Sequence, residues 1–323
     1  MEMTYLLSII IPAYNAGRTI AKTLESISDL LTSKVQLILV DDGSTDGTSD
    51  VIESFVALHS QIKSIRQEHS GVSIARNTGI TFAKGKYIWF VDADDRIDFK
   101  AANDLLGKIE HVDYDFIWFS TAYESLDNRI EEIGAIPSTV KEGINTIRQW
   151  RKYYNGAGML WQYWLKKDII ENKKIRFIKW AKWFEDTHFL LCFAANANTI
   201  YIAPSDRLYY YYVTPWSSIR GSSSKDRYTC NVRVYIDLIR KTTNFQESVR
   251  SFCNGWAAIN IAWCLRYATD DYAKDLYNEC KKALVFPLSI NQGTIKQKIQ
   301  IAILNLNFST YRKFCKFLRI LGR

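Results

Sequence analysis

The stretch Tyr87–Val91 (YIWFV), followed by Asp92–Asp95 (DADD), decides the fold of this chain. Five consecutive apolar residues are typical of a strand buried on both faces of a parallel sheet. The acids begin where that strand must end, and ligands bind at the carboxyl edge of such a sheet. Three neighbouring carboxylates repel one another, so they favour a cation such as Mg²⁺ or Mn²⁺ that substrate phosphates would share. A helix cap or a solvated turn is the alternative interpretation.

The surrounding residues alternate between strand and helix patterns, as in a βαβ sheet. Strands are expected over 6–11, 35–40, 62–65, 87–91 and 116–119, and helices over 19–31, 48–58, 72–83 and 99–109. No G-x-G-x-x-G follows the first strand, so the phosphate turn of a dinucleotide-binding fold is missing. The prediction is an α/β fold, Rossmann-like, with a mostly parallel sheet flanked by helices and a helical C-terminal region.

Composition narrows the class of protein. The 323 residues include 42 Lys and Arg against 34 Asp and Glu, and this basic balance favours anionic partners. No nucleic-acid-binding module is recognisable. Six scattered cysteines without a C-x-x-C indicate free core thiols in a reducing compartment. Neither a secretory signal nor a bilayer-length apolar run is present, so we expect a cytoplasmic protein, either soluble or peripherally bound to the membrane.

Four segments are expected to meet at the carboxyl edge of the sheet. They are Pro12–Asn15, Asp41–Asp46, Gly71–Gly79 and Asp92–Asp95. Loops after parallel strands lie on one edge, which brings these groups together. Each has an ordinary structural alternative, such as a helix cap or an Asx-turn, but one shared site explains all four.

These segments carry a family resemblance. The motifs SIIIPAYN (8–15), LVDDGSTDGT (39–48), ARNTGI (75–80) and FVDADD (90–95) resemble the family 2 glycosyltransferases of the GT-A fold. The resemblance continues at Trp161, 175–177, 185–189 and 208–212, and fades after about residue 225. It implies inverting transfer of a sugar from a nucleotide-diphosphate donor, a UDP-sugar being favoured, with Mn²⁺ or Mg²⁺. A phosphatase of the D-x-D type is less well supported, because its acids usually follow the first strand.

Chemistry and resemblance together assign roles on the donor side. The expected nucleotide-binding residues are Pro12, Tyr14, Asn15, Asp41, Asp42, Arg76, Asp92 and Ala93. Asp41 or Asp42 would accept the imide N–H of uracil, and Arg76 would contact the diphosphate or the sugar. Asp94 is the first choice as metal ligand, with Asp92 beside it.

The acceptor side is expected later in the chain. Asp186 matches the position of the family's general base, and Glu185 is the alternative. Both acids could instead simply begin a helix, where the helix dipole favours them. Trp161, Trp216, Ser218 and Arg220 are expected to contact the acceptor or to belong to a lid.

The expected domains are a GT-A domain over 1–225, with a donor half of about 1–120 and an acceptor half of about 121–225, and a helical region over 226–323. Its tail from Thr294 contains seven Lys and Arg and no acid, alternating with apolar residues. Such a tail could bind an anionic membrane surface, or pack on the domain with a solvated basic side.

The resemblance also limits the pathway. The Q-x-x-R-W segment of processive synthases is missing, so transfer of a single sugar is expected. The acceptor would be a glycan, free or linked to polyprenyl pyrophosphate, in surface polysaccharide (O-antigen or capsule) assembly. The alternative is a non-catalytic nucleotide- or glycan-binding subunit of an assembly complex.

Overall fold

The computed structural model describes residues 5–59, 62–124, 130–133, 136, 143–146, 150–151, 159–212, 224–290 and 293–320. The chain divides into two compact units. The first runs to Lys182 and resumes at Asn196 for the last strand, and the second contains Trp183–Ala195 and the chain from α8 onward. Among the described residues no helix is long and apolar enough to cross a membrane.

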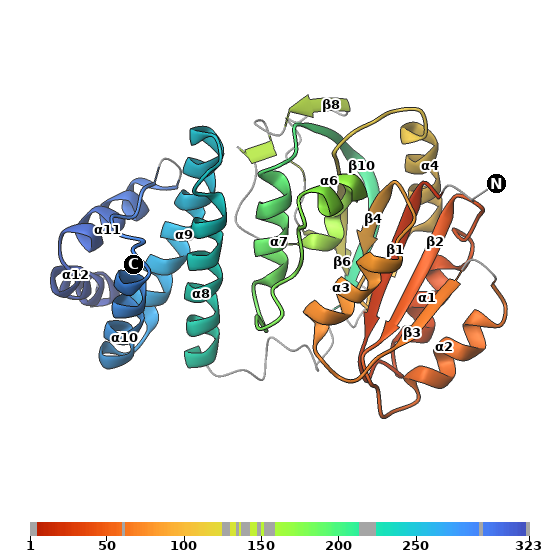
Figure 1. Cartoon of the computed structure of the whole chain (residues 1–323), viewed down its shortest axis with the longest axis horizontal. Helices are drawn as coiled ribbons and strands as arrows, with labels where there is room; N and C mark the ends of the chain where they lie inside the picture. Colours follow the sequence, from red (N-terminus) through yellow and green to blue (C-terminus); the bar gives the residue numbers. More distant parts are fainter. Residues whose placement is uncertain are drawn as a thin grey trace. The chain divides into compact units, whose positions relative to one another are not determined.

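Four parallel strands form one side of the sheet in the first unit (Figure 1). Their order is β3 (Ile62–Arg66), β2 (Val35–Asp41), β1 (Leu7–Ala13) and β4 (Tyr87–Phe90). Every residue of β1, β2 and β4 is buried, as expected for mostly apolar strands inside a parallel sheet. The predicted parallel α/β sheet is therefore confirmed.

The other side of the sheet is mixed. β9 (Tyr163–Lys166) is antiparallel to β4 and β6 (Phe116–Glu124), and β10 (Thr199–Tyr212) is parallel to β6. β5 (Arg96–Ile97) pairs antiparallel with β10 directly after the acidic stretch. Two further short strands complete the sheet: β7 (Ile130–Ile133) on β6 and β8 (Gly143–Thr146) on β10. The sequence patterns predicted β6 but none of the other strands in this paragraph.

Four helices of the first unit follow the predicted alternation. They are α1 (Ile20–Ser28), α2 (Thr48–Val56), α3 (Val72–Phe82) and α4 (Phe99–Ile109). The 3₁₀ turn η1 (Leu160–Gln162) and α6 (Lys167–Asn172) were not predicted. Helix α3 packs on β1 and β2 and approaches β1 closely at Gly79. A Cβ on Gly79 would lie 2.3 Å from Ile10 Cγ2, so no larger side chain fits there without displacement. This contact fixes the helix that carries Arg76.

Aromatic side chains fill the core beneath the acidic stretch. Trp89 and Trp164 are fully buried, with ring centroids 5.6 Å apart. Phe119 meets Trp89 edge to face at 5.5 Å. Since aromatic pairs of this kind bury large areas, they give the β4 end a rigid foundation.

The second unit consists of helices. They are α7 (Glu185–Ala194), α8 (Ser224–Thr242), α9 (Glu247–Tyr267), α10 (Asp270–Lys282), α11 (Ile295–Leu306) and α12 (Phe308–Ile320). Helices α8 and α9 run side by side (Figure 1). All six cysteines are buried and none forms a disulfide, as the sequence predicted. Helix α7 packs on α8 and so groups with the C-terminal helices, whereas the boundary expected near residue 225 assigns it to the N-terminal region.

Candidate active site

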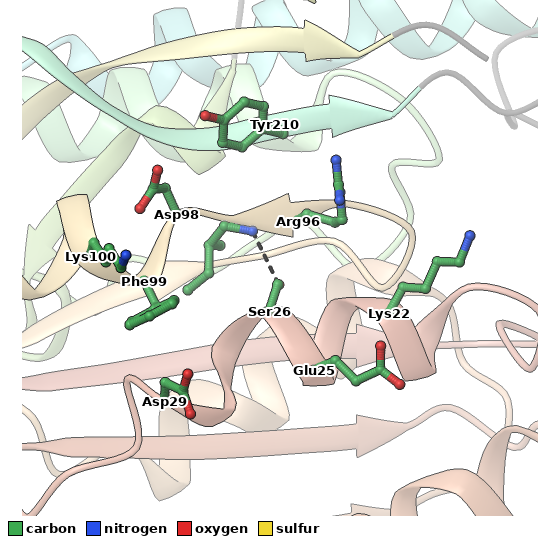
Figure 2. Close-up of a pocket in the computed structure, with 10 residues that line it drawn as sticks. Lys22, Glu25, Ser26, Asp29, Arg96, Asp98, Phe99, Lys100 and Tyr210 are labelled. Atoms are coloured by element: carbon green, nitrogen blue, oxygen red, sulfur yellow. Dashed lines mark hydrogen bonds between the residues drawn. The ribbon is translucent and has the colours of Figure 1, made fainter. Parts of the chain in front are cut away.

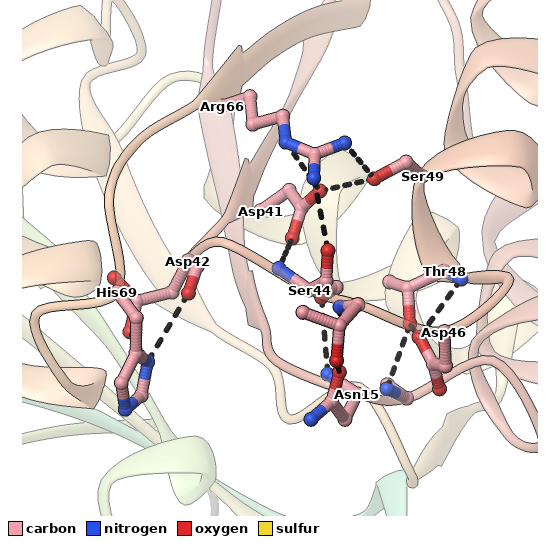
Figure 3. Close-up of polar contacts among 11 residues, drawn as sticks. Asn15, Asp41, Asp42, Ser44, Asp46, Thr48, Ser49, Arg66 and His69 are labelled. Atoms are coloured by element: carbon pink, nitrogen blue, oxygen red, sulfur yellow. Dashed lines mark hydrogen bonds and ion pairs between the residues drawn. The ribbon is translucent and has the colours of Figure 1, made fainter.

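The loops after β1 and β2 are joined by polar contacts (Figure 3). The backbone N–H of Asn15 donates to Ser44 Oγ at 3.0 Å, and Asn15 Oδ1 accepts from Thr45 N at 2.9 Å. Asp46 accepts from Gly17 N at 3.0 Å and from Thr48 N. Pro12, at the end of β1, lies directly before this loop. The two loops therefore form one preorganised rim at the carboxyl edge of the sheet.

Asp41 is a buried anchor of this rim. Its carboxylate accepts from Ser44 N at 2.9 Å and from Ser49 Oγ at 2.5 Å, and Arg66 Nε lies 3.8 Å away. Burial raises the pKa of Asp41, but the hydrogen bonds from Ser44 and Ser49 outweigh it, and the net pKa is lowered. Asp41 is therefore a charged group that holds its loop.

Asp42 holds the segment after β3. It accepts from Gln67 Nε2 at 2.6 Å, from Ser70 N at 3.0 Å and from Gly71 N at 2.8 Å. Its side chain is only 3% exposed, and these bonds use most of its acceptor capacity. Asp42 thus orders the approach to α3, where Gly71 has φ 92°.

Tyr14 is exposed and stacks on His69, with ring centroids 3.9 Å apart and planes 20° from parallel. His69 Nδ1 lies 2.9 Å from Asp42 Oδ2, which fixes the imidazole. The sequence analysis identified Tyr14 but missed His69, because nothing in its local pattern marks it. Together they offer a flat aromatic surface at the rim.

Helix α3 brings a cation to the acids. Arg76 Nη2 lies 3.0 Å from Asp92 Oδ1, and the guanidinium is 5.4 Å from the ring centroid of Phe177. The next residue, Asn77, makes two 2.9 Å hydrogen bonds with the backbone of Phe177. In the ARNTGI motif, Arg76 therefore pairs with Asp92, and the next residue, Asn77, holds the 175–177 segment.

The acidic stretch divides into two kinds of carboxylate. Asp95 is fully buried and accepts from Tyr209 Oη at 2.5 Å and from Tyr212 N at 2.7 Å. Asp92 and Asp94 are only partly buried. Asp95 therefore fastens β10 to the end of β4, and the other two acids are the ones available to a ligand.

The acids raise one another's proton affinity. Burial, and then the charge of Asp92, raise the pKa of Asp94 to about 6. Burial, Asp92 and Asp94 also raise the pKa of Asp95 well above its ordinary value. A divalent cation would relieve the repulsion between these negative charges. The carboxylates are therefore compatible with Mg²⁺ or Mn²⁺ as the bound ion.

A metal here would need ligands from the substrate as well. Among the described residues no group of three or more His, Cys, Asp or Glu side chains is arranged to hold a metal ion. Mg²⁺ commonly takes one or two carboxylates and completes its shell with water and phosphate oxygens. Asp92 and Asp94 fit that pattern.

Trp161 is connected to the acidic stretch Asp92–Asp95 through Tyr209. Its ring stacks on Tyr209 at 4.7 Å and on Tyr211 at 5.8 Å, nearly parallel to both. Tyr209 in turn donates to Asp95, and its oxygen accepts from the backbone N–H of Asp92. The partly buried Trp161 thus supports the tyrosine that orders the acidic turn.

The predicted base lies in the second unit, at the start of α7. Asp186 is partly buried and accepts from Thr187 N at 2.7 Å, whereas Glu185 is 8% exposed. Two residues on, His188 Nε2 lies 2.8 Å from Asp237 Oδ2 of α8. Burial lowers the pKa of His188, but the interactions with Cys192 and Asp237 raise it by more, so the net pKa is raised to about 9. This ion pair fixes the turn that carries Asp186.

A hollow of about 770 Å³ opens beside the acidic turn in the first unit (Figure 2). Its charged lining residues are Lys22, Arg96, Lys100, Glu25, Asp29 and Asp98. Tyr210 lines it, since alternate residues of a strand face opposite sides and its neighbours Tyr209 and Tyr211 face Trp161. None of the predicted donor residues lines this hollow.

The structure brings most predicted donor-side residues to one edge. Asn15, Asp41, Asp42, Arg76 and Asp92 are linked through the contacts above, and Ala93 is buried between the acids. Trp216, Ser218 and Arg220 lie outside the described residues. The arrangement defines an α/β domain with an acidic, metal-compatible turn at the carboxyl edge of its sheet.

The comparisons with known proteins identify the family. The family model for glycosyl transferase family 2 matches residues 8–190, and this chain belongs to that family. The sequence is 28% identical over 190 residues to the uncharacterised glycosyltransferase YibD of Escherichia coli strain K12, covering 55% of this chain and 53% of YibD. The match to the poly(ribitol-phosphate) β-N-acetylglucosaminyltransferase TarP of Staphylococcus aureus strain N315 is 26% over 65% of this chain and 64% of TarP. The matched part therefore spans less than two thirds of either relative.

A solved structure shares the fold over nearly the whole chain. The structure of S. aureus TarS 1–349 in complex with UDP-GlcNAc superposes with a TM-score of 0.76 at 17% identity, over 97% of this chain and 91% of that one. The likeness confirms the GT-A-like sheet and the helical C-terminal region.

Proposed function

We propose that this protein is an inverting glycosyltransferase that moves one sugar from a nucleotide-diphosphate donor, a UDP-sugar, to a glycan acceptor. The observation that carries the proposal is the meeting of Arg76 with Asp92 beside Asp94 at the carboxyl edge of the sheet. Family membership supports the reaction class, and TarS, a similar structure, is described in complex with UDP-GlcNAc.

On the donor side, Tyr14 and His69 would cover the base, within a rim built by Pro12 and Asn15. That Asp41 or Asp42 accepts the uracil imide N–H stays a prediction, since both carboxylates already accept hydrogen bonds that hold the rim. Asp92, next to Ala93, would meet the ribose, and Arg76 the diphosphate. A divalent ion held by Asp94 and Asp92 would supply charge stabilisation to the departing nucleoside diphosphate.

On the acceptor side, Asp186 would take the proton from the attacking hydroxyl as the new glycosidic bond forms. The oxygen would attack the anomeric carbon from the face opposite the leaving diphosphate, which inverts that centre. Glu185 is the alternative base. Trp161, Trp216, Ser218 and Arg220 remain proposed acceptor or lid residues.

The first test is ligand-dependent thermal stability. We expect UDP with Mn²⁺ to raise the melting temperature more than GDP with Mn²⁺ or phosphate with Mn²⁺, and chelation of Mn²⁺ to remove most of the gain. At a hundredfold excess over Kd the stabilisation is about 2.7 kcal/mol. If no nucleotide stabilises the protein, the proposal is wrong.

The acceptor class is a glycan of bacterial surface-polysaccharide assembly, such as O-antigen or capsule, carried on polyprenyl pyrophosphate. The relative TarP is named for transfer to poly(ribitol-phosphate), a cell-surface polymer, and this supports the class without choosing the acceptor. We place the protein in the cytoplasm, at the inner face of the membrane.

Helices α11 and α12 support that placement. Ile301, Leu304 and Tyr311 are buried in the second unit, so the tail packs on its own unit. Yet Leu306 is 84% and Phe317 55% exposed, on helices whose exposed charges include Lys298 and Lys313. Exposed apolar and basic residues together suit an anionic lipid surface.

Vesicle flotation tests this placement. We expect the wild-type protein to float with anionic vesicles and not with neutral ones. Replacing Lys298 and Lys313 by Gln should weaken anionic-vesicle binding about thirtyfold, at about 1 kcal/mol for each lysine. The matched control replaces the exposed Lys63 and Lys100 of the first unit. Equal flotation of wild type and the Lys298 and Lys313 variant would rule out this surface.

A further inference from the structure

A small pocket in the second unit has features that the transfer reaction leaves unexplained. It lies between α9 and α11 and has a volume of about 220 Å³. Its lining includes Trp263, Arg266, Lys296, Gln297 and Gln300, and no acid is among the described residues that line it. The volume is below the roughly 300 Å³ at which pockets for larger organic ligands begin, so it suits one sugar ring rather than a nucleotide.

Gln300 points to a missing hydrogen-bond partner. Its side chain is 7% exposed, and among the described residues its Nε2 has no hydrogen-bond partner. A buried amide group left unsatisfied is costly, so an oxygen acceptor on a ligand would be favoured there. The neighbouring Gln297 is already engaged, because its Oε1 accepts from Thr294 N at 2.7 Å in a capping box.

Trp263 supplies an exposed aromatic face. Its side chain is 47% exposed, and it is held by Tyr228 at 5.5 Å and by Tyr267 at 5.2 Å between ring centroids. An indole held between two tyrosines presents a fixed apolar surface, on which the C–H face of a pyranose can stack. This rigidity limits the entropy lost on binding.

The charge of the pocket is positive. Arg266, 7% exposed, and the exposed Lys296 both line it. The pocket also adjoins the first turn of α11, where the helix dipole favours an anion. A carboxylate or phosphate on the ligand would match this charge.

We propose that this pocket binds one anionic sugar residue, a uronic acid or a sugar phosphate, of a glycan chain. The sugar ring would stack on Trp263, a ring or hydroxyl oxygen would accept from Gln300 Nε2, and the anionic group would face Arg266 and Lys296. Binding here needs no transfer chemistry. The pocket would hold a glycan independently of the donor.

The test is direct binding of glycan probes to the full chain, measured by calorimetry and by saturation-transfer NMR. The probes are a hyaluronan tetrasaccharide, which carries glucuronate, the neutral chitotetraose, glucose 6-phosphate and inorganic phosphate. We expect the hyaluronan fragment and glucose 6-phosphate to bind, and chitotetraose and inorganic phosphate to bind at least about tenfold more weakly.

Variants assign the binding to this pocket. Gln300→Leu and Trp263→Ala should each weaken binding of the anionic sugars about tenfold or more. Lys296→Gln is also expected to weaken binding of the anionic sugars. Because it changes only an exposed side chain, that weaker binding cannot be attributed to unfolding. The control Trp180→Ala removes a similarly exposed tryptophan of the first unit and should leave binding unchanged.

Three results would overturn the proposal. The first is equal binding of inorganic phosphate and glucose 6-phosphate. The second is unchanged sugar binding in Lys296→Gln. The third is that no probe sugar binds the wild-type protein while Lys296→Gln loses vesicle flotation, which would make the pocket part of a lipid-binding surface. Stabilisation by UDP with Mn²⁺ is measured separately. The pocket can therefore fail while the donor site stands, or stand while the donor site fails.

Discussion

Replacing Asp94 by alanine is expected to reduce both sugar transfer and donor hydrolysis roughly a thousandfold. A metal ion at a leaving group contributes several kcal/mol to the transition state, and each 1.4 kcal/mol is about tenfold in rate. The measurement is release of the nucleoside diphosphate, in a screen of UDP-, GDP- and TDP-sugars with Mn²⁺, followed by the best donor with the variant.

The loss should not come from unfolding. Burial and Asp92 raise the pKa of Asp94, so the fold gains nothing from its charge, and the melting temperature of the variant without ligand should stay close to that of the wild type. The matched control Asp104→Asn removes an exposed acid of α4 and should retain full activity. Hydrolysis within about threefold of wild type at saturating Mn²⁺ would contradict the role of Asp94 as a metal ligand.

Asp95 marks the limit of sequence reasoning at this turn. The pattern located the acids at the end of a buried strand, and the structure confirms that position. The pattern could not show that Asp95 has a structural role and that Asp92 and Asp94 are available to a ligand. That difference depends on the hydrogen bond from Tyr209, which lies 114 residues after Asp95. A contact of such long sequence range leaves no local signal.

The same reason explains the strands that were missed. β1 and β2 are short, mostly apolar runs buried on both faces and separated by a helical pattern, which is a local signal for buried parallel strands. β5 has only two residues and exists because it pairs with β10. β10 itself contains Pro-Ser-Asp at 204–206, a sequence typical of a turn.

The loop acids show a different limit. Their residue types suit recognition of a base, and their place at the edge of the sheet was predicted correctly. The bonds from Gln67, Ser70 and Gly71 to Asp42 cannot be inferred from sequence, because the segment after β3 has no regular pattern. The partners of a carboxylate decide whether it shapes a loop or meets a ligand.

Replacing Asp186 by asparagine is expected to reduce transfer about a hundredfold or more, the usual range for loss of a general base. Stabilisation by UDP with Mn²⁺ should survive, because the proposed role of Asp186 is to take the acceptor proton and not to hold the nucleotide. Transfer is measured with the best donor from the screen and a lipid-linked glycan acceptor, and nucleotide binding by melting temperature.

The control for Asp186 addresses the ordinary role of an acid at the start of a helix. Asp271 is an exposed acid in the first turn of α10, and the helix dipole favours both acids by about 0.3–1 kcal/mol. If Asp186 served only its helix, Asp186→Asn and Asp271→Asn would change stability by similar small amounts and neither would change transfer. If Asp186 is the general base, Asp186→Asn would lose transfer while its stability stays nearly unchanged. Asp271→Asn would keep its transfer activity. Equal transfer in the two variants would remove Asp186 as the base and leave Glu185 as the next to test.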